Sequence, residues 1–264
     1  MIPSFDLHTH TTYCDGKNSP AEMAAAALAQ GMSCLGFSGH CYTFFDESYC
    51  MSKAGTEAYR SEIAALREQY AGRLRILCGI EQDYWSGEST EGYDYVIGSV
   101  HYVKSGGDYL PVDESPEHWQ RAVDTHFGGD PYAFAEAYFE TVSDVVRRTG
   151  CTIIGHFDLI SKFIERTHSF DESNPRYVAA WQSTMDRLLP YGVPFEINTG
   201  AMSRGYRTSP YPNPDMIRYL CDHGGKLILS SDSHSGQTLR YHFSDFSDLS
   251  AHLIDSPDRI LRSA

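Results

Sequence analysis

Short apolar runs recur along the chain, and each has a length that suits a strand. They span four to eight residues and have the β-branched content of strands that are covered on both faces. Runs of this kind predict a sheet buried between other elements. We therefore expect strands at 5–8, 33–38, 74–81, 93–100, 152–156, 193–198 and 226–231.

Helical patterns occupy most of the segments between these runs. The first begins at Ser19-Pro20, where the serine suits the cap and the proline suits the first turn. The patterns predict helices at 19–30, 54–70, 130–148, 174–189 and 213–223. Strand and helix thus alternate, which indicates a parallel sheet with helical crossovers.

The alternation continues through the chain without a linker or a short-period repeat. We therefore expect a single domain over residues 1–264, of class α/β. Seven strand–helix units favour a closed barrel over an open sheet. The longest irregular stretches are 39–53, 84–92 and 103–130, and long loops in a domain of this kind often carry function.

Potential metal ligands stand at or just beyond the ends of six of the seven predicted strands. The set comprises six histidines and three carboxylates: His8, His10, Asp15, His40, Glu81, His101, His156, Asp232 and His234. In a parallel barrel the carboxyl ends of all strands share one face, so these groups would converge there. Imidazole and carboxylate together suit zinc, manganese or iron, and nine groups exceed what one ion takes. We expect two or three metal ions, bridged by a shared carboxylate.

The joint occurrence of these groups carries the prediction, because each has an ordinary explanation when taken alone. A single histidine at a strand end is more often a satisfied polar residue than a ligand, and Glu81 could begin a solvated loop. The other six histidines follow no predicted strand, and we expect them at the surface: His118, His126, His168, His223, His242 and His252.

Composition and charge exclude several classes of protein. The formal net charge of −14 argues against a protein that binds nucleic acid through a broad basic face. A hydrophobic content of 41% argues against disorder, and no apolar run is long enough to predict a membrane span. The first residues lack the pattern of a signal peptide, and the seven cysteines form no Cys-x-x-Cys pair. We therefore expect reduced thiols and a cytoplasmic protein.

The motifs at the strand ends resemble those of one known family. In chain order they are His8-Thr9-His10 with Asp15, Ser38-Gly39-His40, Gly79-Ile80-Glu81, Gly98-Ser99-Val100-His101, Gly155-His156 and Ser231-Asp232-Ser233-His234. Together they are similar to the polymerase and histidinol phosphatase (PHP) superfamily, over residues 5 to 236. Residues 97–101 and 195–199 look most like its histidinol-phosphate phosphatase branch. The resemblance implies a distorted (β/α)7 barrel of the TIM-like kind.

The resemblance also implies three divalent metal ions, which would be zinc, manganese or iron. One would be held by His8, His10, Glu81 and Asp232, a second by Glu81, His101 and His156, and a third by Asp15, His40 and His234. Some members have histidine or glutamate where this chain has Asp15. That departure leaves the identity of the third metal open.

The function implied by the resemblance is hydrolysis of L-histidinol phosphate to L-histidinol and phosphate, a step of histidine biosynthesis. The enzyme would be a metal-dependent phosphomonoesterase that acts through a metal-bridging hydroxide. Its catalytic residues would be Glu81, Asp232, His234 and Arg204. Three cations that follow strands five and six are candidates for binding the substrate: Lys162, Arg204 and Arg207.

Three other interpretations remain open at the level of sequence. The first is a PHP phosphoesterase that acts on a nucleotide or on another small phosphate ester, and the second is a non-catalytic metal-binding barrel. The third is covalent catalysis by Cys14 or Cys41, although no Cys-x5-Arg phosphate loop surrounds either residue. We expect a small phosphate ester as the binding partner, with no nucleic-acid polymer and no membrane. The oligomeric state is left open.

Overall fold

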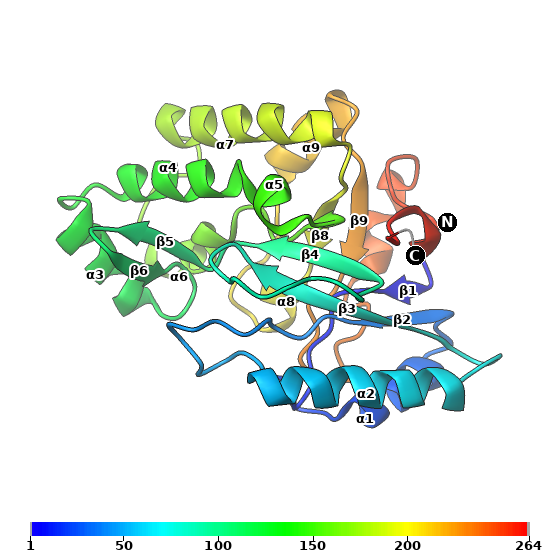
Figure 1. The fold of residues 1–264 in the computed structure, drawn as a ribbon. Helices are drawn as coiled ribbons and strands as arrows, with labels where there is room; N and C mark the ends of the chain where they lie inside the picture. The colour runs from blue at the N-terminus through cyan, green and yellow to red at the C-terminus, as the bar shows by residue number, and fades with distance from the viewer. Residues whose placement is uncertain (1, 263–264) are drawn as a thin grey trace.

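Seven parallel strands form a barrel in the computed structural model, which describes residues 2–262 (Figure 1). The strands lie in chain order: β1 (Phe5–Asp6), β2 (Cys34–Phe37), β3 (Arg75–Asp83), β4 (Tyr95–Ser99), β7 (Ile153–Ile154), β8 (Phe195–Asn198) and β9 (Leu227–Ser230). The first and last strands meet just beyond their ends. There the amide of His10 donates to the carbonyl of Ser233 at 2.8 Å, and the amide of Ser233 donates to the carbonyl of His8 at 3.1 Å. The distorted (β/α)7 barrel is thereby confirmed.

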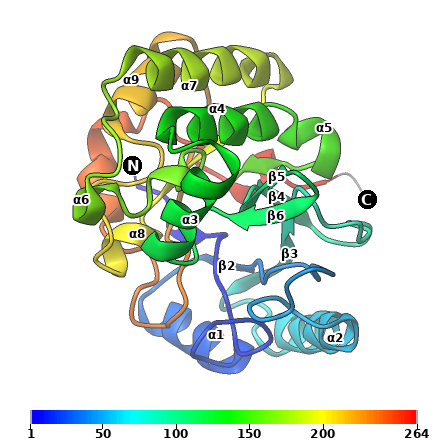
Figure 2. The ribbon, with the colours of Figure 1, turned by 90° about the vertical axis from the view of Figure 1, so that its left-hand side faces the viewer.

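Helices cover the outside of the barrel on two sides. The predicted ones are present as α1 (Pro20–Ala29), α2 (Lys53–Gln69), α4 (Pro131–Val142), α5 (Val145–Thr149), α7 (Pro175–Leu188) and α9 (Pro214–Asp222). Figures 1 and 2 show α1 and α2 on one side and α4, α7 and α9 on the opposite side. The single helix predicted at 130–148 is divided at Ser143-Asp144 into α4 and α5. Short helical turns complete the chain: η1 (Leu159–Ser161), α6 (Ile164–Thr167), η2 (Leu189–Tyr191), α8 (Gly200–Ser203), η3 (Phe243–Leu249) and η4 (Pro257–Arg259).

The segment 103–130, which we expected to be irregular, is largely regular, so this prediction is wrong. It forms the antiparallel hairpin β5 (Tyr102–Ser105) and β6 (Asp108–Pro111), followed by α3 (Pro116–His126). The hairpin turns at Gly106-Gly107, where both residues have positive φ. Its strands are short and partly exposed, so they lack the continuous apolar run that marks a barrel strand. In Figure 2 the hairpin and α3 lie side by side.

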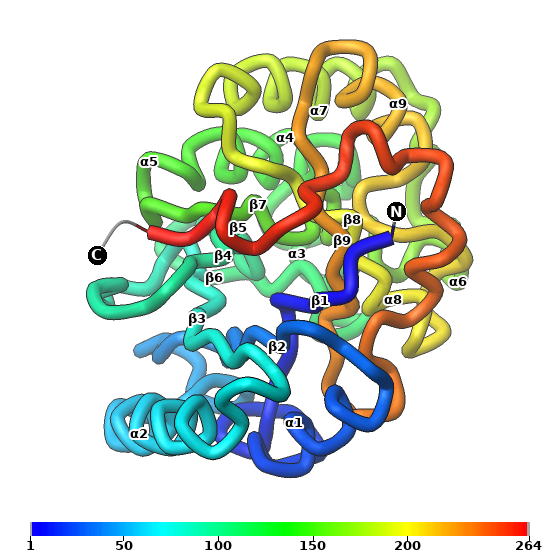
Figure 3. The backbone as a smooth tube through the Cα atoms, turned by 90° about the vertical axis from the view of Figure 1, so that its right-hand side faces the viewer, coloured from blue at the N-terminus to red at the C-terminus, as the bar shows by residue number. Residues whose placement is uncertain are grey.

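The small hydrophobic cluster inside the barrel positions the strand ends. It includes residues from six of the seven barrel strands. Ile254 and Ile260 also belong to it, so the C-terminal segment packs against the barrel (Figure 3). The Tyr95 hydroxyl donates to the carbonyls of Leu7 at 2.5 Å and Phe37 at 2.9 Å. Side chains alternate along β3, so Glu81 points to the same face as Leu77. Toward the carboxyl ends of the strands, the apolar interior of the barrel therefore gives way to a layer of polar side chains, to which Glu81 belongs.

Within residues 2–262, no helix is long and apolar enough to cross a membrane.

Replacement of Gly79 by alanine should destabilise the barrel. A Cβ atom at this position would overlap the ring of Tyr95, which is fully buried. Overpacking of this kind typically lowers the free energy of unfolding by about 2 kcal/mol, which lowers Tm by about 4 °C or more. Thermal unfolding followed by circular dichroism measures the change. Gly87→Ala is the matched control, because a Cβ atom at Gly87 has no heavy atom within 4 Å; equal Tm values for the two variants would contradict the packing described here.

Candidate metal centre

One buried carboxylate lies at the centre of the polar layer. Glu81 is 1% exposed, and its two oxygens face different groups of histidines. Oε2 lies 2.9 to 3.5 Å from nitrogens of His8, His10 and His40. Oε1 lies 2.8 Å from Nε2 of His156 and 3.4 Å from Nε2 of His101. The structure therefore brings five imidazoles from four separate strand ends onto one side chain.

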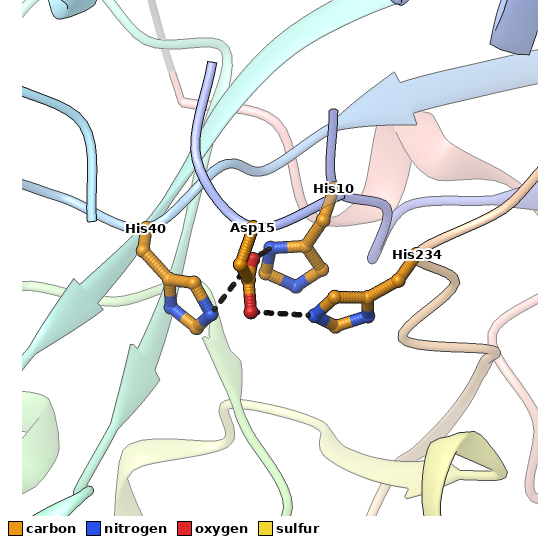
Figure 4. A group of neighbouring side chains, drawn as sticks. All are labelled: His10, Asp15, His40 and His234. Carbon is orange, nitrogen blue, oxygen red and sulfur yellow. Dashed lines mark hydrogen bonds and ion pairs between the residues drawn. The ribbon is translucent and has the colours of Figure 1, made fainter. Parts of the chain in front are cut away.

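Two further carboxylates lie beside the same histidines. Asp232 Oδ1 is 3.2 Å from Nε2 of His10 and 3.5 Å from Nδ1 of His234. Asp15 Oδ2 is 3.0 Å from Nε2 of His234, and Asp15 Oδ1 is 3.7 Å from Nε2 of His40. Figure 4 shows His10, Asp15, His40 and His234 pointing toward one another. All nine side chains that the sequence singled out as ligands thus lie in one connected group.

Three overlapping clusters have ligand atoms close enough together to hold an ion. Their members are His10, Asp15, His40 and His234; His8, His10 and Asp232; and His40, Glu81 and His101. Within each cluster the ligand atoms lie within 4.8 Å of one another. The division differs from the expected one in three ways. His156 belongs to none of the clusters although it contacts Glu81, and His40 takes its place beside Glu81 and His101. His10 also joins the cluster of Asp15, and Glu81 is not part of the cluster of His8. The six histidines expected at the surface lie outside the clusters, and each is partly or fully exposed.

Unpartnered buried atoms show that this donor set fits metal ions. His8 Nε2, His10 Nε2 and Glu81 Oε2 converge, yet none of them has a hydrogen-bond partner among the described residues. A buried polar atom without a partner costs about 1 to 3 kcal/mol. A cation between these atoms would satisfy all three. The residues are therefore able to bind metal.

The charges of the surrounding pocket point the same way. The pocket has a volume of about 260 Å³, and among the described residues it is lined by six carboxylates, four histidines and the two cations Lys162 and Arg204. Bound metal ions would offset the charge of the carboxylates and so favour an anionic ligand.

The histidines and carboxylates of the centre polarise one another strongly. Burial alone would raise the pKa of Glu81, but His40 and His8 hold it well below its usual range. Burial lowers the pKa of His10 to about 3, and His234 and His40 act in the same direction. Burial alone would lower the pKa of His8, but Glu196 and Glu81 raise it well above its ordinary value. Metal binding would displace the proton from such an imidazole, because neutral imidazole and ionised carboxylate are the forms that coordinate metals.

Two carboxylates that the sequence analysis missed hold the ligands from behind. Glu196 Oε1 lies 2.6 Å from Nδ1 of His8, and Glu196 Oε2 accepts a hydrogen bond from the amide of His156 at 2.9 Å. Asp83 Oδ2 lies 3.2 Å from Nδ1 of His101. These contacts leave Nε2 of each imidazole free to face Glu81. The available signal was strand alternation, because Asp83 follows Glu81 by two residues on β3.

The three predicted substrate cations have different surroundings. Arg204 lines the pocket, and its guanidinium donates to Oδ2 and to the carbonyl of Asp232, both at 3.0 Å. Lys162 also lines the pocket, where it pairs with Asp113. Arg207 is 4% exposed and does not line the pocket. It donates instead to Ser161 and to Glu172, so its position supports a structural role rather than contact with a substrate.

The cysteines near the centre are poor candidates for nucleophiles. Burial raises the pKa of both Cys14 and Cys41 to about 12, so the thiols remain protonated near neutral pH. The structure therefore gives no support to covalent catalysis by either residue.

Comparison with known proteins gives the family of this chain. Residues 6–200 match the family model described as "PHP domain". The chain belongs to the PHP family. A Schizosaccharomyces pombe protein named "Probable histidinol-phosphatase" is 35% identical over 200 residues, which cover 70% of this PHP chain and 63% of that protein. A Deinococcus radiodurans protein of the same name is 30% identical over 251 residues, which cover 91% of this chain and 90% of the relative.

Two crystal structures share the fold of this PHP domain. A Listeria monocytogenes protein superposes with a TM-score of 0.81 at 19% identity, covering 92% of this chain and 99% of the other. The histidinol phosphate phosphatase of Lactococcus lactis, in complex with zinc, L-histidinol and phosphate, gives a TM-score of 0.74 at 18% identity, with 98% of each chain covered. At these identities the likeness concerns the fold.

Replacement of Glu196 by glutamine in this PHP domain should weaken metal binding. The variant keeps the shape of the side chain but loses the charge that orients His8, and loss of such a partner typically lowers metal affinity about 10- to 100-fold. Zinc titration against a chromogenic chelator measures the affinity. Glu140→Gln is the control, because Glu140 is exposed and pairs with Arg187 on the helical surface. Unchanged affinity in Glu196→Gln would show that His8 does not depend on this contact.

Proposed function

We propose that this PHP domain is a metal-dependent phosphomonoesterase that hydrolyses L-histidinol phosphate to L-histidinol and phosphate, as a step of histidine biosynthesis. The observation that carries the proposal is the connected group of six histidines around the buried carboxylates of Glu81 and Asp232, part of which lines the pocket. All nine ligand positions are filled, which argues against a non-catalytic barrel. The names of the relatives and the ligands in the Lactococcus lactis structure support histidinol phosphate as the substrate.

Three divalent ions, of zinc, manganese or iron, are part of the proposal. We assign His8, His10, Glu81 and Asp232 to the first, Glu81, His101 and His156 to the second, and Asp15, His40 and His234 to the third. The position of Glu81 supports a bridging role, because Oε2 faces His8 and His10 while Oε1 faces His101 and His156. Bound divalent ions supply an activated water and stabilise negative charge on phosphoryl oxygens.

The side chains of this protein position the ester and balance its charge. Arg204 keeps Asp232 oriented through two hydrogen bonds and also lies 3.0 Å from Nδ1 of His234, and we assign its remaining N–H groups to a phosphate in the pocket. Asp232 in turn contacts His10 and His234. We therefore assign catalytic roles to Glu81, Asp232, His234 and Arg204, with Arg204 as the phosphate-binding cation.

A single domain in the cytoplasm completes the proposal. One large hydrophobic cluster includes residues from Met23 to Leu253, which supports one domain over 1–264. All seven cysteines are unpaired, which suits a reducing compartment.

The purified protein should release phosphate from L-histidinol phosphate faster than from nucleotides or sugar phosphates. Removal of metal with a chelator should abolish the activity, and zinc or manganese should restore it, because bound divalent ions supply the activated water and the positive charge that the phosphoryl group needs. Phosphate release across a panel of esters, together with elemental analysis of the protein, measures both effects. A preference for a nucleotide would exclude the proposed substrate, and full activity after chelation would exclude the proposed mechanism.

Replacement of Arg204 by methionine should lower kcat/KM for histidinol phosphate by about 100-fold or more, because one charged donor is lost from the phosphate and from Asp232. Steady-state kinetics measure the loss, and metal content shows whether the centre is retained. Arg218→Met is the control, since Arg218 is exposed and pairs only with Asp215 among the residues described. Equal kinetics in the two variants would remove Arg204 from the proposed site.

A further inference from the structure

Above the metal ligands, the wall of the pocket is acidic and aromatic. Its carboxylates are Asp46, Asp113 and Glu114, and its rings are Tyr49, Tyr102 and Tyr206. Such a wall does not suit phosphate, because carboxylates repel it. Carboxylates and aromatic rings do suit an ammonium group and an imidazole ring, and L-histidinol carries both. The wall thus matches the leaving alcohol of the proposed substrate in charge and in shape.

Of the three carboxylates, Asp46 already accepts hydrogen bonds on both oxygens, and Glu114 is exposed to solvent. Asp46 uses both oxygens, since Oδ1 accepts from Ser48 and Oδ2 accepts from the hydroxyl of Tyr102 at 2.7 Å. The Glu114 side chain is 53% exposed and lies 3.4 Å from Nδ1 of His118. Neither carboxylate is both fixed and open toward the pocket.

Asp113 is the carboxylate that is both fixed and open. Its Oδ2 accepts from Nζ of Lys162 at 2.9 Å, and its carbonyl accepts from the same Nζ at 2.8 Å. Within residues 2–262, Oδ1 of Asp113 makes no side-chain hydrogen bond, and the side chain is 24% exposed. The amide of the preceding Val112 donates to the carbonyl of His101 at 2.9 Å, which places Asp113 beside the metal ligands.

The pairing with Lys162 explains how a carboxylate can lie near a phosphate. Lys162 balances the charge of Asp113, so the pair does not repel the ester, while Oδ1 still accepts a hydrogen bond from a cation. Burial alone would raise the pKa of Asp113, but Lys162 keeps it below its ordinary value, so the acceptor is ionised at neutral pH. The ring of Tyr206 lies 5.1 Å from Nζ of Lys162 and helps to hold it.

We propose that Asp113 binds the ammonium group of the leaving alcohol and that Lys162 is its positioning residue. The inference rests on the proposed function, because the ammonium group belongs to L-histidinol phosphate. In this ester the amino carbon is bonded to the carbon that carries the ester oxygen. An ammonium group bound beside His101 therefore keeps the ester bond close to the metal ligands. The imidazole then extends toward the tyrosine wall, where Tyr49 and Tyr102 lie 6.3 Å apart between ring centres.

The test compares Asp113→Asn with the wild-type enzyme on two esters, L-histidinol phosphate and the analogue that lacks the amino group. We expect kcat/KM for histidinol phosphate to fall about 10- to 100-fold, mainly through KM, because a charged hydrogen bond is lost. For the analogue, kcat/KM should change less than about twofold. Asp215→Asn is the matched control, because Asp215 is exposed, pairs with Arg218 and does not line the pocket, so it should leave both substrates unchanged. Metal content and circular dichroism verify that each variant retains its ions and its fold.

A second variant separates this role of Lys162 from direct binding of phosphate. Lys162→Met should raise KM for histidinol phosphate more than for the analogue, because the lost charge balance affects both esters, whereas the lost orientation of Asp113 affects only the ester with the amino group. Equal losses on both esters in Lys162→Met would instead place Lys162 on the phosphate and overturn its positioning role. Equal losses on both esters in Asp113→Asn, or no loss on either, would overturn the ammonium site. If the wild-type enzyme does not hydrolyse histidinol phosphate at all, the proposed function fails, and the ammonium site fails with it.

Discussion

Burial of the Glu81 carboxylate is the constraint on which the rest of the site depends. An ionised carboxylate with 1% exposure is stable only if positive charge or hydrogen-bond donors surround it. Here five imidazoles contact it, and each comes from the end of a barrel strand or the loop that follows. The barrel must therefore close tightly enough to bring these strand ends together. Tyr95 contributes to that closure, since its hydroxyl joins the carbonyl groups of Leu7 and Phe37 within the interior.

Around this centre, charged side chains that are not ligands themselves orient several of the ligands. Glu196 and Asp83 occupy the Nδ1 atoms of His8 and His101, and Arg204 occupies one oxygen of Asp232. Orientation from behind is how proteins tune metal-binding imidazoles, because the partner selects the tautomer and the direction of the lone pair. Among the described residues, the inward-facing atoms His8 Nε2, His10 Nε2 and Glu81 Oε2 make no hydrogen bond. The arrangement is thus preorganised for cations.

The pocket divides the proposed substrate according to charge. Its floor takes the phosphate once ions are bound, and its wall carries the carboxylates and rings that suit the alcohol. The hairpin β5–β6 and the segment after it supply much of that wall, including Tyr102 and Asp113. The proposed recognition of the alcohol and the proposed metal chemistry therefore reside in different parts of the chain.

The sequence by itself determined the barrel and its metal-binding floor. Apolar runs, capped helices and ligands at the strand ends are local patterns, and parallel strands carry their carboxyl ends to one face whatever the details of packing. Local patterns did not reveal the hairpin, whose strands are short and half exposed, nor the partners of individual side chains. Arg207 and Lys162 are both cations that follow a predicted strand. Arg207 is nevertheless buried against Ser161, whereas Lys162 pairs with Asp113 in the pocket. Only the tertiary structure decided these partners, because they depend on how residues far apart in the chain approach one another, which no local spacing encodes.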